Sequence, residues 1–172
     1  MKRMFGLMVV AATVFAAGPE LDACGDKSLS AGGIRFQRAA AARNPASVLA
    51  YVRPNSQMAT ATRQLKLQGW LGVVGHRYHE VASLSELRTS IETGQFNIVV
   101  ADLGEIGELE RSLGPSSARV VLVPVAGKLT KAETRAAQQQ HRFLITVSSR
   151  VNEYLDTIHN AVRLGSASPR KA

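Results

Sequence analysis

The sequence predicts an α/β domain built on a doubly wound, five-stranded parallel sheet with the strand order 2-1-3-4-5. Short apolar runs alternate along the chain with segments whose apolar residues recur at helical spacing. This alternation of strands and helices is typical of a parallel sheet with helices on both faces. Right-handed crossovers leave few strand orders for such a chain, and 2-1-3-4-5 is the leading one.

The third predicted strand is the clearest of the five. Ile98 to Ala101 is an unbroken apolar run, as expected for a strand covered on both faces, and it ends in Asp102. The carboxyl ends of central parallel strands form the crevice where ligands bind in open sheets. The other strands are expected at 47–52, 77–81, 119–123 and 143–147.

Capping residues and breakers mark the helices between these strands. After the turn at Pro54, either Asn55 or Ser56 can cap a first helix that continues towards Gly75. Two Ser/Thr-x-x-Glu capping boxes, 83–86 and 130–133, open the second and fourth helices. The third helix is expected at 106–113, before a Gly-Pro breaker, and the last one after 149, with apolar residues through 162 on one face.

The first residues have the pattern of a secretory signal peptide, which we assign to residues 1–23. Lys2 and Arg3 precede an uncharged apolar run, 4–17, that is too short to span a bilayer comfortably. The alternative is a buried N-terminal helix, but that does not explain why basic residues come first. Residues 24–45 are then an irregular tether, 46–165 the folded domain and 166–172 a polar, basic tail.

The sole cysteine, Cys24, follows Leu21-Asp22-Ala23 and resembles the lipobox cysteine of bacterial lipoproteins. Leu21 and Ala23 match that pattern, whereas Asp22 departs from it. If the resemblance holds, Cys24 carries a lipid and anchors the chain to a membrane. If it does not, Cys24 is an unpaired thiol on an exported protein. We therefore expect an exported bacterial protein, periplasmic or membrane-anchored.

The formal net charge is +8, and removing residues 1–23 leaves it unchanged because two basic and two acidic residues are lost together. Excess positive charge favours acidic partners in general. The basic residues are scattered, however, and aromatic residues make up only 5% of the chain. Without a basic cluster interleaved with aromatics, we do not expect nucleic-acid binding.

The order and length of the predicted elements resemble the flavodoxin-like receiver domain of bacterial response regulators, the CheY-like family, over roughly residues 46–164. Asp102, at the end of the third strand, stands where the family has its phosphoacceptor aspartate. The resemblance implies signal transduction, with a partner surface formed by the fourth helix, fifth strand and fifth helix. In this chain that surface corresponds to residues 131–163.

The other residues that the receiver reaction needs are missing. Transfer of a phosphoryl group to a carboxylate needs a magnesium ion and a cation, because negative charge is brought onto negative charge. Where the family has its metal-binding acidic pair, this chain has Val52, Arg53 and Pro54. The positions of the family's switch hydroxyl and lysine correspond to about Pro124 and Thr146. We therefore expect no metal and no cofactor.

These observations predict a non-catalytic, exported receiver-like domain that acts as a binding or interaction module. Asp102 is then a structural residue that caps or holds the loop to Gly104, and Arg53 is expected to form an ion pair with it. Two alternatives stay open: a phosphoacceptor domain in a phosphorelay that uses Asp102, and a small-anion binder that uses Arg53 and Asn55 at the start of the first helix.

Apart from the receiver-like position of Asp102, we find no common catalytic motif in the sequence. It has no glycine-rich nucleotide-binding loop and no Gly-x-Ser-x-Gly element. His76 and His79 would point to opposite faces of one strand and have no cysteine nearby, so a zinc site is not expected.

Overall fold

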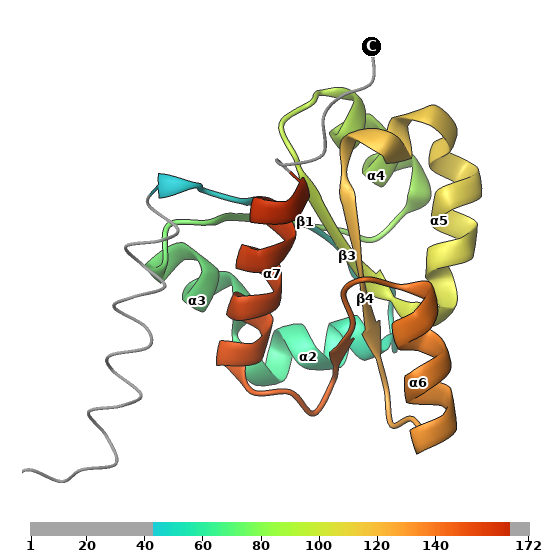
Figure 1. Cartoon of the computed structure of the whole chain (residues 1–172). Helices are drawn as coiled ribbons and strands as arrows, with labels where there is room; N and C mark the ends of the chain where they lie inside the picture. Colours follow the sequence, from blue (N-terminus) through green and yellow to red (C-terminus); the bar gives the residue numbers. More distant parts are fainter. Residues whose placement is uncertain (1–42, 166–172) are drawn as a thin grey trace, which may run out of the picture.

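The computed structural model describes residues 43–165, which contain one five-stranded parallel sheet in the order β2-β1-β3-β4-β5 (Figure 1). The strand order is the one that the sequence predicts. The strands are β1 (Ser47–Tyr51), β2 (Arg77–Val81), β3 (Ile98–Asp102), β4 (Val121–Ala126) and β5 (Ile145–Thr146).

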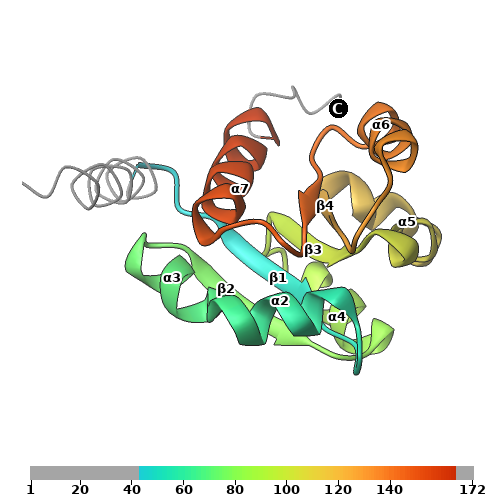
Figure 2. The same cartoon turned by 90° about the horizontal axis from the view of Figure 1, so that it is seen from below.

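The helices lie on both faces of the sheet (Figures 1 and 2). One face packs against α2 (Gln57–Leu65), α3 (Leu67–Val73) and α7 (Val151–Gly165). The other packs against α4 (Leu84–Glu92) and α5 (Ile106–Leu113). The remaining elements are α6 (Lys131–Gln140), η1 (Leu103–Glu105) and η2 (Gly114–Arg119). The domain is therefore an α/β, doubly wound, flavodoxin-like arrangement.

The central strands hold the two apolar cores together. Successive residues of β1 and β3 point to opposite faces, so Val48 and Ile98 enter the core with α7 while Leu49 and Val99 enter the core with α4 and α5. All five β1 residues are buried, whereas four of the five residues of the edge strand β2 are exposed or half-buried. This burial explains why continuous apolar runs mark the strands predicted at 47–52 and 98–101.

Three helices begin at the capping residues that the sequence indicates. The hydroxyl oxygens of Ser56, Ser83 and Thr130 accept hydrogen bonds from backbone N–H groups of α2, α4 and α6. At Thr130 the capping box is complete, because Glu133 accepts in return from the Thr130 N–H at 2.8 Å. Of the two residues considered for the first cap, Ser56 is the one used.

The structure corrects three of the predicted element boundaries. The first helix is divided into α2 and α3 at Lys66, which has the left-handed φ of 49°. We expected the fourth strand at 119–123, whereas β4 begins at Val121 and continues through Pro124 to Ala126. Its neighbour β5 is only two residues long and pairs with β4 from Val125 onwards.

His76 ties the start of the described chain to the sheet. Its Nδ1 accepts the Ala46 N–H at 2.9 Å, and the next N–H, that of Arg77, donates to the Ala46 carbonyl oxygen at 2.8 Å. The side chain is only 5% exposed. Burial, and to a smaller extent the charge of His159, lower the pKa of His76 from its ordinary 6.5 to about 4. His76 is therefore a neutral hydrogen-bond acceptor at neutral pH.

Stability is expected to fall as the pH is lowered from about 6.5 to about 4. In that window the unfolded chain binds a proton at His76 and the folded chain does not, so protonation favours unfolding. His76→Asn keeps an acceptor near the Nδ1 position but does not titrate, so its stability should depend less on pH than that of the wild type. Urea denaturation at a series of pH values measures this difference.

The matched control is His79→Asn in β2, the strand that begins directly after His76, since His79 is exposed. Its pH profile should follow that of the wild type. A His76→Asn profile parallel to the wild-type profile would contradict the assignment.

Candidate functional site

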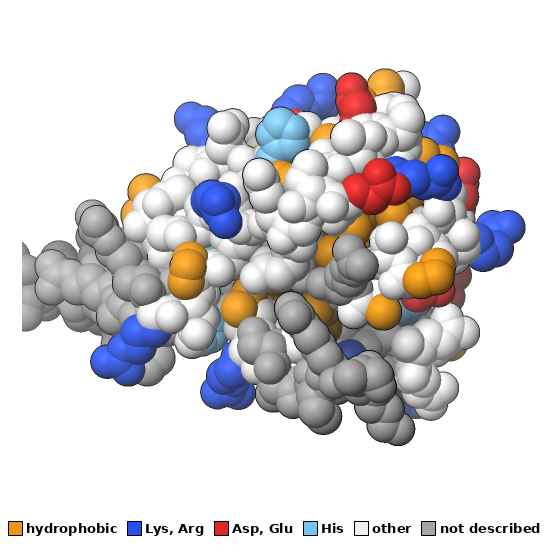
Figure 3. Space-filling view, turned by 90° about the horizontal axis from the view of Figure 1, so that it is seen from above, with side chains coloured by type: hydrophobic (Ala, Val, Ile, Leu, Met, Phe, Trp, Pro, Cys, Tyr) orange, Lys and Arg blue, Asp and Glu red, His pale blue; other side chains and the backbone are white. Residues whose placement is uncertain are grey.

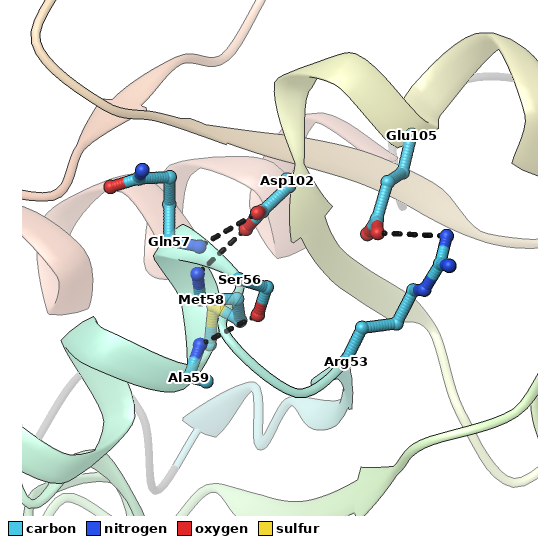
Figure 4. A network of polar contacts seen from close by, with 7 residues as sticks. All are labelled: Arg53, Ser56, Gln57, Met58, Ala59, Asp102 and Glu105. Carbon is cyan, nitrogen blue, oxygen red and sulfur yellow. Dashed lines mark hydrogen bonds and ion pairs between the residues drawn. The ribbon is translucent and has the colours of Figure 1, made fainter.

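Asp102 lies at the carboxyl end of β3 and holds the start of α2 (Figure 4). Its Oδ2 accepts the Gln57 N–H at 2.7 Å and its Oδ1 accepts the Met58 N–H at 2.6 Å. Such short bonds from backbone N–H groups to a carboxylate are the charge-assisted kind. The helix dipole adds to the attraction, because the first turn of a helix carries partial positive charge. Both carboxylate oxygens are thus bonded to the same helix end.

The third free N–H of α2 is satisfied as well. The Ser56 hydroxyl accepts the Ala59 N–H at 2.9 Å, and the Ser56 carbonyl oxygen accepts the Thr60 N–H at 3.2 Å, which starts the regular helix. A helix N-terminus offers an anion site when these N–H groups are free. Here Asp102 and Ser56 occupy the donors that such an anion would need.

The backbone conformation of the turn between β1 and α2 suits the residue types at Pro54 and Asn55. The Ser56 N–H donates to the Arg53 carbonyl oxygen at 3.2 Å, which closes a four-residue turn. Asn55 has a φ of 62°, and proline followed by a residue of positive φ is the pattern of a type II turn. Asn55 is exposed and serves the turn through its backbone conformation.

The predicted ion pair between Arg53 and Asp102 is wrong. Arg53 Nη1 instead lies 3.4 Å from Oε1 of Glu105, in the short helix η1 that follows β3 (Figure 4). The Asp102 carboxylate is turned towards the α2 end, which leaves Glu105 as the partner of Arg53. The Arg53 side chain is 51% exposed, so this pair adds little to stability. The hydrogen bonds of Asp102 likewise join β3 to α2, not to the loop at Gly104 as we expected.

Glu105 is the acidic residue of the site with a shifted pKa. Burial, and then the nearby charge of Asp102, raise the pKa of Glu105, while Arg53 acts in the opposite direction. Its second oxygen, Oε2, is buried without a hydrogen-bond partner among the described residues. Sequence reasoning missed Glu105, because it lies three residues beyond the strand and only the fold of η1 brings it towards Arg53.

The strand register shows which residues stand level with Asp102. Asp102 is opposite Val125 on β4, and Pro124 is opposite Ala101, so the aligned position lies one residue beyond the one assigned from the sequence. Thr146 of β5 is opposite Ala126. Valine and proline both lack a hydroxyl. Within residues 43–165 no group of three or more His, Cys, Asp or Glu side chains is placed to hold a metal ion.

Tyr154 lies close to this end of the sheet and was not predicted as a core residue. Its side chain is fully buried on α7, and its hydroxyl donates to the Thr146 carbonyl oxygen at 3.5 Å. Burial, and then the charge of Asp102, raise the pKa of Tyr154. The helical apolar spacing indicated its neighbour Leu155, but the amphipathic tyrosine gave no comparable signal.

Two hollows lie away from Asp102. One, of about 650 Å³, is at the amino end of β1 and β2, with Arg77, His79 and Phe96 among its lining residues. The other, of about 430 Å³, lies between α7 and the segment before β5 and is lined in part by Arg142, Phe143 and Arg163. Neither was predicted, because each forms only where separate segments of the chain pack against one another.

The remaining predicted site residue, Cys24, lies outside the described residues, as do the predicted signal peptide and most of the tether. Among the helices of residues 43–165, none is long and apolar enough to span a membrane. The five-stranded parallel sheet is compatible with a CheY-like domain. No family model matches the chain, and neither the curated proteins nor the solved structures contain a match to it.

Replacing Asp102 with alanine should destabilise the domain by about 1–3 kcal/mol, because two α2 N–H groups lose a charged acceptor. Asp102→Asn keeps one acceptor oxygen and should lie between alanine and the wild type. Thermal and urea denaturation measure both effects.

Glu110→Ala on α5 is the control, since it removes an exposed carboxylate from a neighbouring helix and should change stability little. If Asp102→Ala unfolds at the wild-type midpoint, the capping role of Asp102 is refuted.

Proposed function

We propose that this domain is a non-catalytic, receiver-like interaction module in which the strand-end aspartate has a structural task in place of phosphoryl transfer. The observation that carries the proposal is the pair of hydrogen bonds from the Gln57 and Met58 N–H groups to Asp102, at 2.7 and 2.6 Å. A carboxylate that attacks a phosphoryl group needs a free oxygen and a cation that offsets the incoming charge. Here both oxygens are engaged.

The surroundings of Asp102 support the same proposal. The cation nearest in sequence to the first strand's end, Arg53, pairs with Glu105. The β4 residue level with Asp102 is Val125. Neither can take the place of the metal-binding acids or the hydroxyl that the receiver resemblance implies.

The small-anion alternative is less well supported by the same geometry. It needs free N–H groups at the start of α2, and those of Gln57, Met58 and Ala59 already have acceptors in Asp102 and Ser56. The presence of asparagine at position 55 is explained by the positive φ that the turn requires there.

For the interaction surface we propose residues 131–163, which comprise α6, β5 and most of α7. In α6 only Ala137 is buried, and nearly all the other side chains of the helix are exposed. Helix α6 therefore leaves more of its surface available to a partner than the helices that cover the cores. The hollow beside Arg142 and Phe143 adjoins the same surface. The partner is proposed to be another protein.

We further propose that the domain is exported and, if Cys24 is lipidated, anchored to a membrane. The support for this is the sequence of residues 1–24: a basic start, an apolar run and a cysteine in a lipobox-like setting. Histidine kinases that feed response regulators draw on cytoplasmic ATP, so export fits a domain that does not receive phosphate.

The protein is expected to remain unmodified when it is incubated with acetyl phosphate and Mg²⁺, or with beryllofluoride and Mg²⁺. Intact-protein mass spectrometry measures phosphate incorporation, and the Asp102→Asn variant gives the background. Incorporation in the wild type that disappears in Asp102→Asn would establish the phosphoacceptor alternative instead.

A photo-crosslinking residue at Ala136, which is exposed on α6, is expected to capture a partner protein in cells. The control position is Glu110, which is also exposed, on α5, and lies outside the proposed surface. Gel shifts followed by mass spectrometry identify the product. Capture of the same protein at both positions, or at Glu110 alone, would contradict the assignment of residues 131–163.

A further inference from the structure

One stretch of the domain has basic side chains and no acidic ones. Residues 43–79, which form β1, α2, α3 and the start of β2, contain no aspartate or glutamate. Their basic residues are Arg43, Arg53, Arg63, Lys66 and Arg77. In Figure 3 the acidic side chains lie on the half of the visible face that carries α4 and α5, whereas basic side chains lie on both halves. The charge of the domain is thus asymmetric.

Helix α3 places apolar side chains on this basic side. Leu67 and Leu71 point into the core, whereas Trp70 and Val73 are 38% and 49% exposed. Val73 follows Trp70 by three residues, so the two share one outward face of α3, and the exposed residue Lys66 stands at the N-cap position, four residues before Trp70. This face, defined by Lys66, Trp70 and Val73, is called the α3 face below.

The α3 face lies near the point where residues 1–42 join the domain. The His76 N–H donates to the Leu71 carbonyl oxygen at 2.9 Å, and His76 in turn accepts the Ala46 N–H. Figures 1 and 2 both show the start of the described chain close to α3. The predicted mature chain begins at Cys24, which is separated from Arg43 by residues 25–42. That separation spans at most about 60–65 Å when extended.

We propose that the α3 face docks on the surface of an anionic lipid bilayer. A tryptophan ring beside a lysine is suited to the headgroup region, where the ring contacts acyl chains and the cation contacts phosphate. Basic residues close to an anionic bilayer add roughly independent increments of attraction. An acidic protein could pair with the basic side chains but would also need a pocket or groove for the Trp70 ring. A bilayer needs no such pocket, because the ring of an outward-facing helix can insert directly between the lipids.

This inference concerns a different surface from the proposed interaction module and does not require Cys24 to be lipidated. The apolar run 4–17 of the predicted signal peptide would bring an uncleaved chain to a vesicle by itself, so the chain tested begins at Cys24, and pelleting alone does not decide the matter. The environment of Trp70 does, because Trp70 is the single tryptophan of the chain.

The experiment uses residues 24–172, the predicted mature chain, without lipid modification, and vesicles of phosphatidylglycerol mixed with phosphatidylcholine. Trp70 emission is expected to shift to shorter wavelength with anionic vesicles, and brominated lipid should quench it. Vesicles of phosphatidylcholine alone should give little shift, and about 0.5 M salt should reverse most of the shift, because it screens charges beyond a few ångströms.

The matched variants are Arg63→Gln/Lys66→Gln and Lys131→Gln/Arg135→Gln. Each removes two positive charges, but the first pair stands in the last turn of α2 and at the start of α3, while the second lies on α6. The first pair should lower the docked-to-undocked ratio about tenfold or more, and the second should leave it nearly unchanged. Val73→Ser should weaken docking without any change of charge.

Three results would overturn the inference: no emission shift while the protein pellets with anionic vesicles, equal loss in both charge variants, or a shift that depends on protein concentration in the absence of vesicles. The last would identify a second copy of the chain as the occupant. None of these outcomes bears on the phosphorylation or crosslinking experiments, so the two proposals can fail separately.

Discussion

The contact between the Asp102 carboxylate and the first turn of α2 organises the carboxyl end of this sheet. It joins the end of the central strand β3 to a helix that begins some 45 residues earlier in the chain, through hydrogen bonds of 2.7 and 2.6 Å. Parallel strands bring such helix starts and strand ends to the same edge, which is why open sheets usually bind ligands there. In this domain the positive end of the helix and the negative end of the strand neutralise each other.

The sequence predicts the sheet well because its strand signals come from burial. Ile98 to Ala101 and Val48 to Ala50 are covered on both faces, and β-branched, uncharged runs reflect that directly. Helix starts at Ser56, Ser83 and Thr130 are predicted for a similar reason, since a capping hydroxyl acts within three residues of its own position. These interactions are local or depend only on which side of an element is buried.

The side-chain contacts of the site could not be predicted in the same way. Whether Arg53 pairs with Asp102 or with Glu105 depends on the path of η1 and on the orientation of the Asp102 carboxylate. Neither feature produces a periodic pattern in the sequence. The division of α2 from α3 at Lys66 is likewise a single left-handed residue within a continuous apolar spacing. Glu105 lies only three residues after Asp102, and yet it, and not Asp102, is the acidic partner of Arg53.

The strand order also separates the two surfaces proposed for binding. The edge strand β2 follows α3, while α6 connects β4 to the opposite edge strand β5, and Figures 1 and 2 both show α3 and α6 on opposite sides of the domain. A domain held at a bilayer by the α3 face therefore leaves α6 facing away from the lipid. The Asp102 oxygens are engaged by hydrogen bonds within the domain, and both proposed surfaces lie away from them. Docking at one face and partner binding at the other are sterically compatible because the sheet keeps them apart.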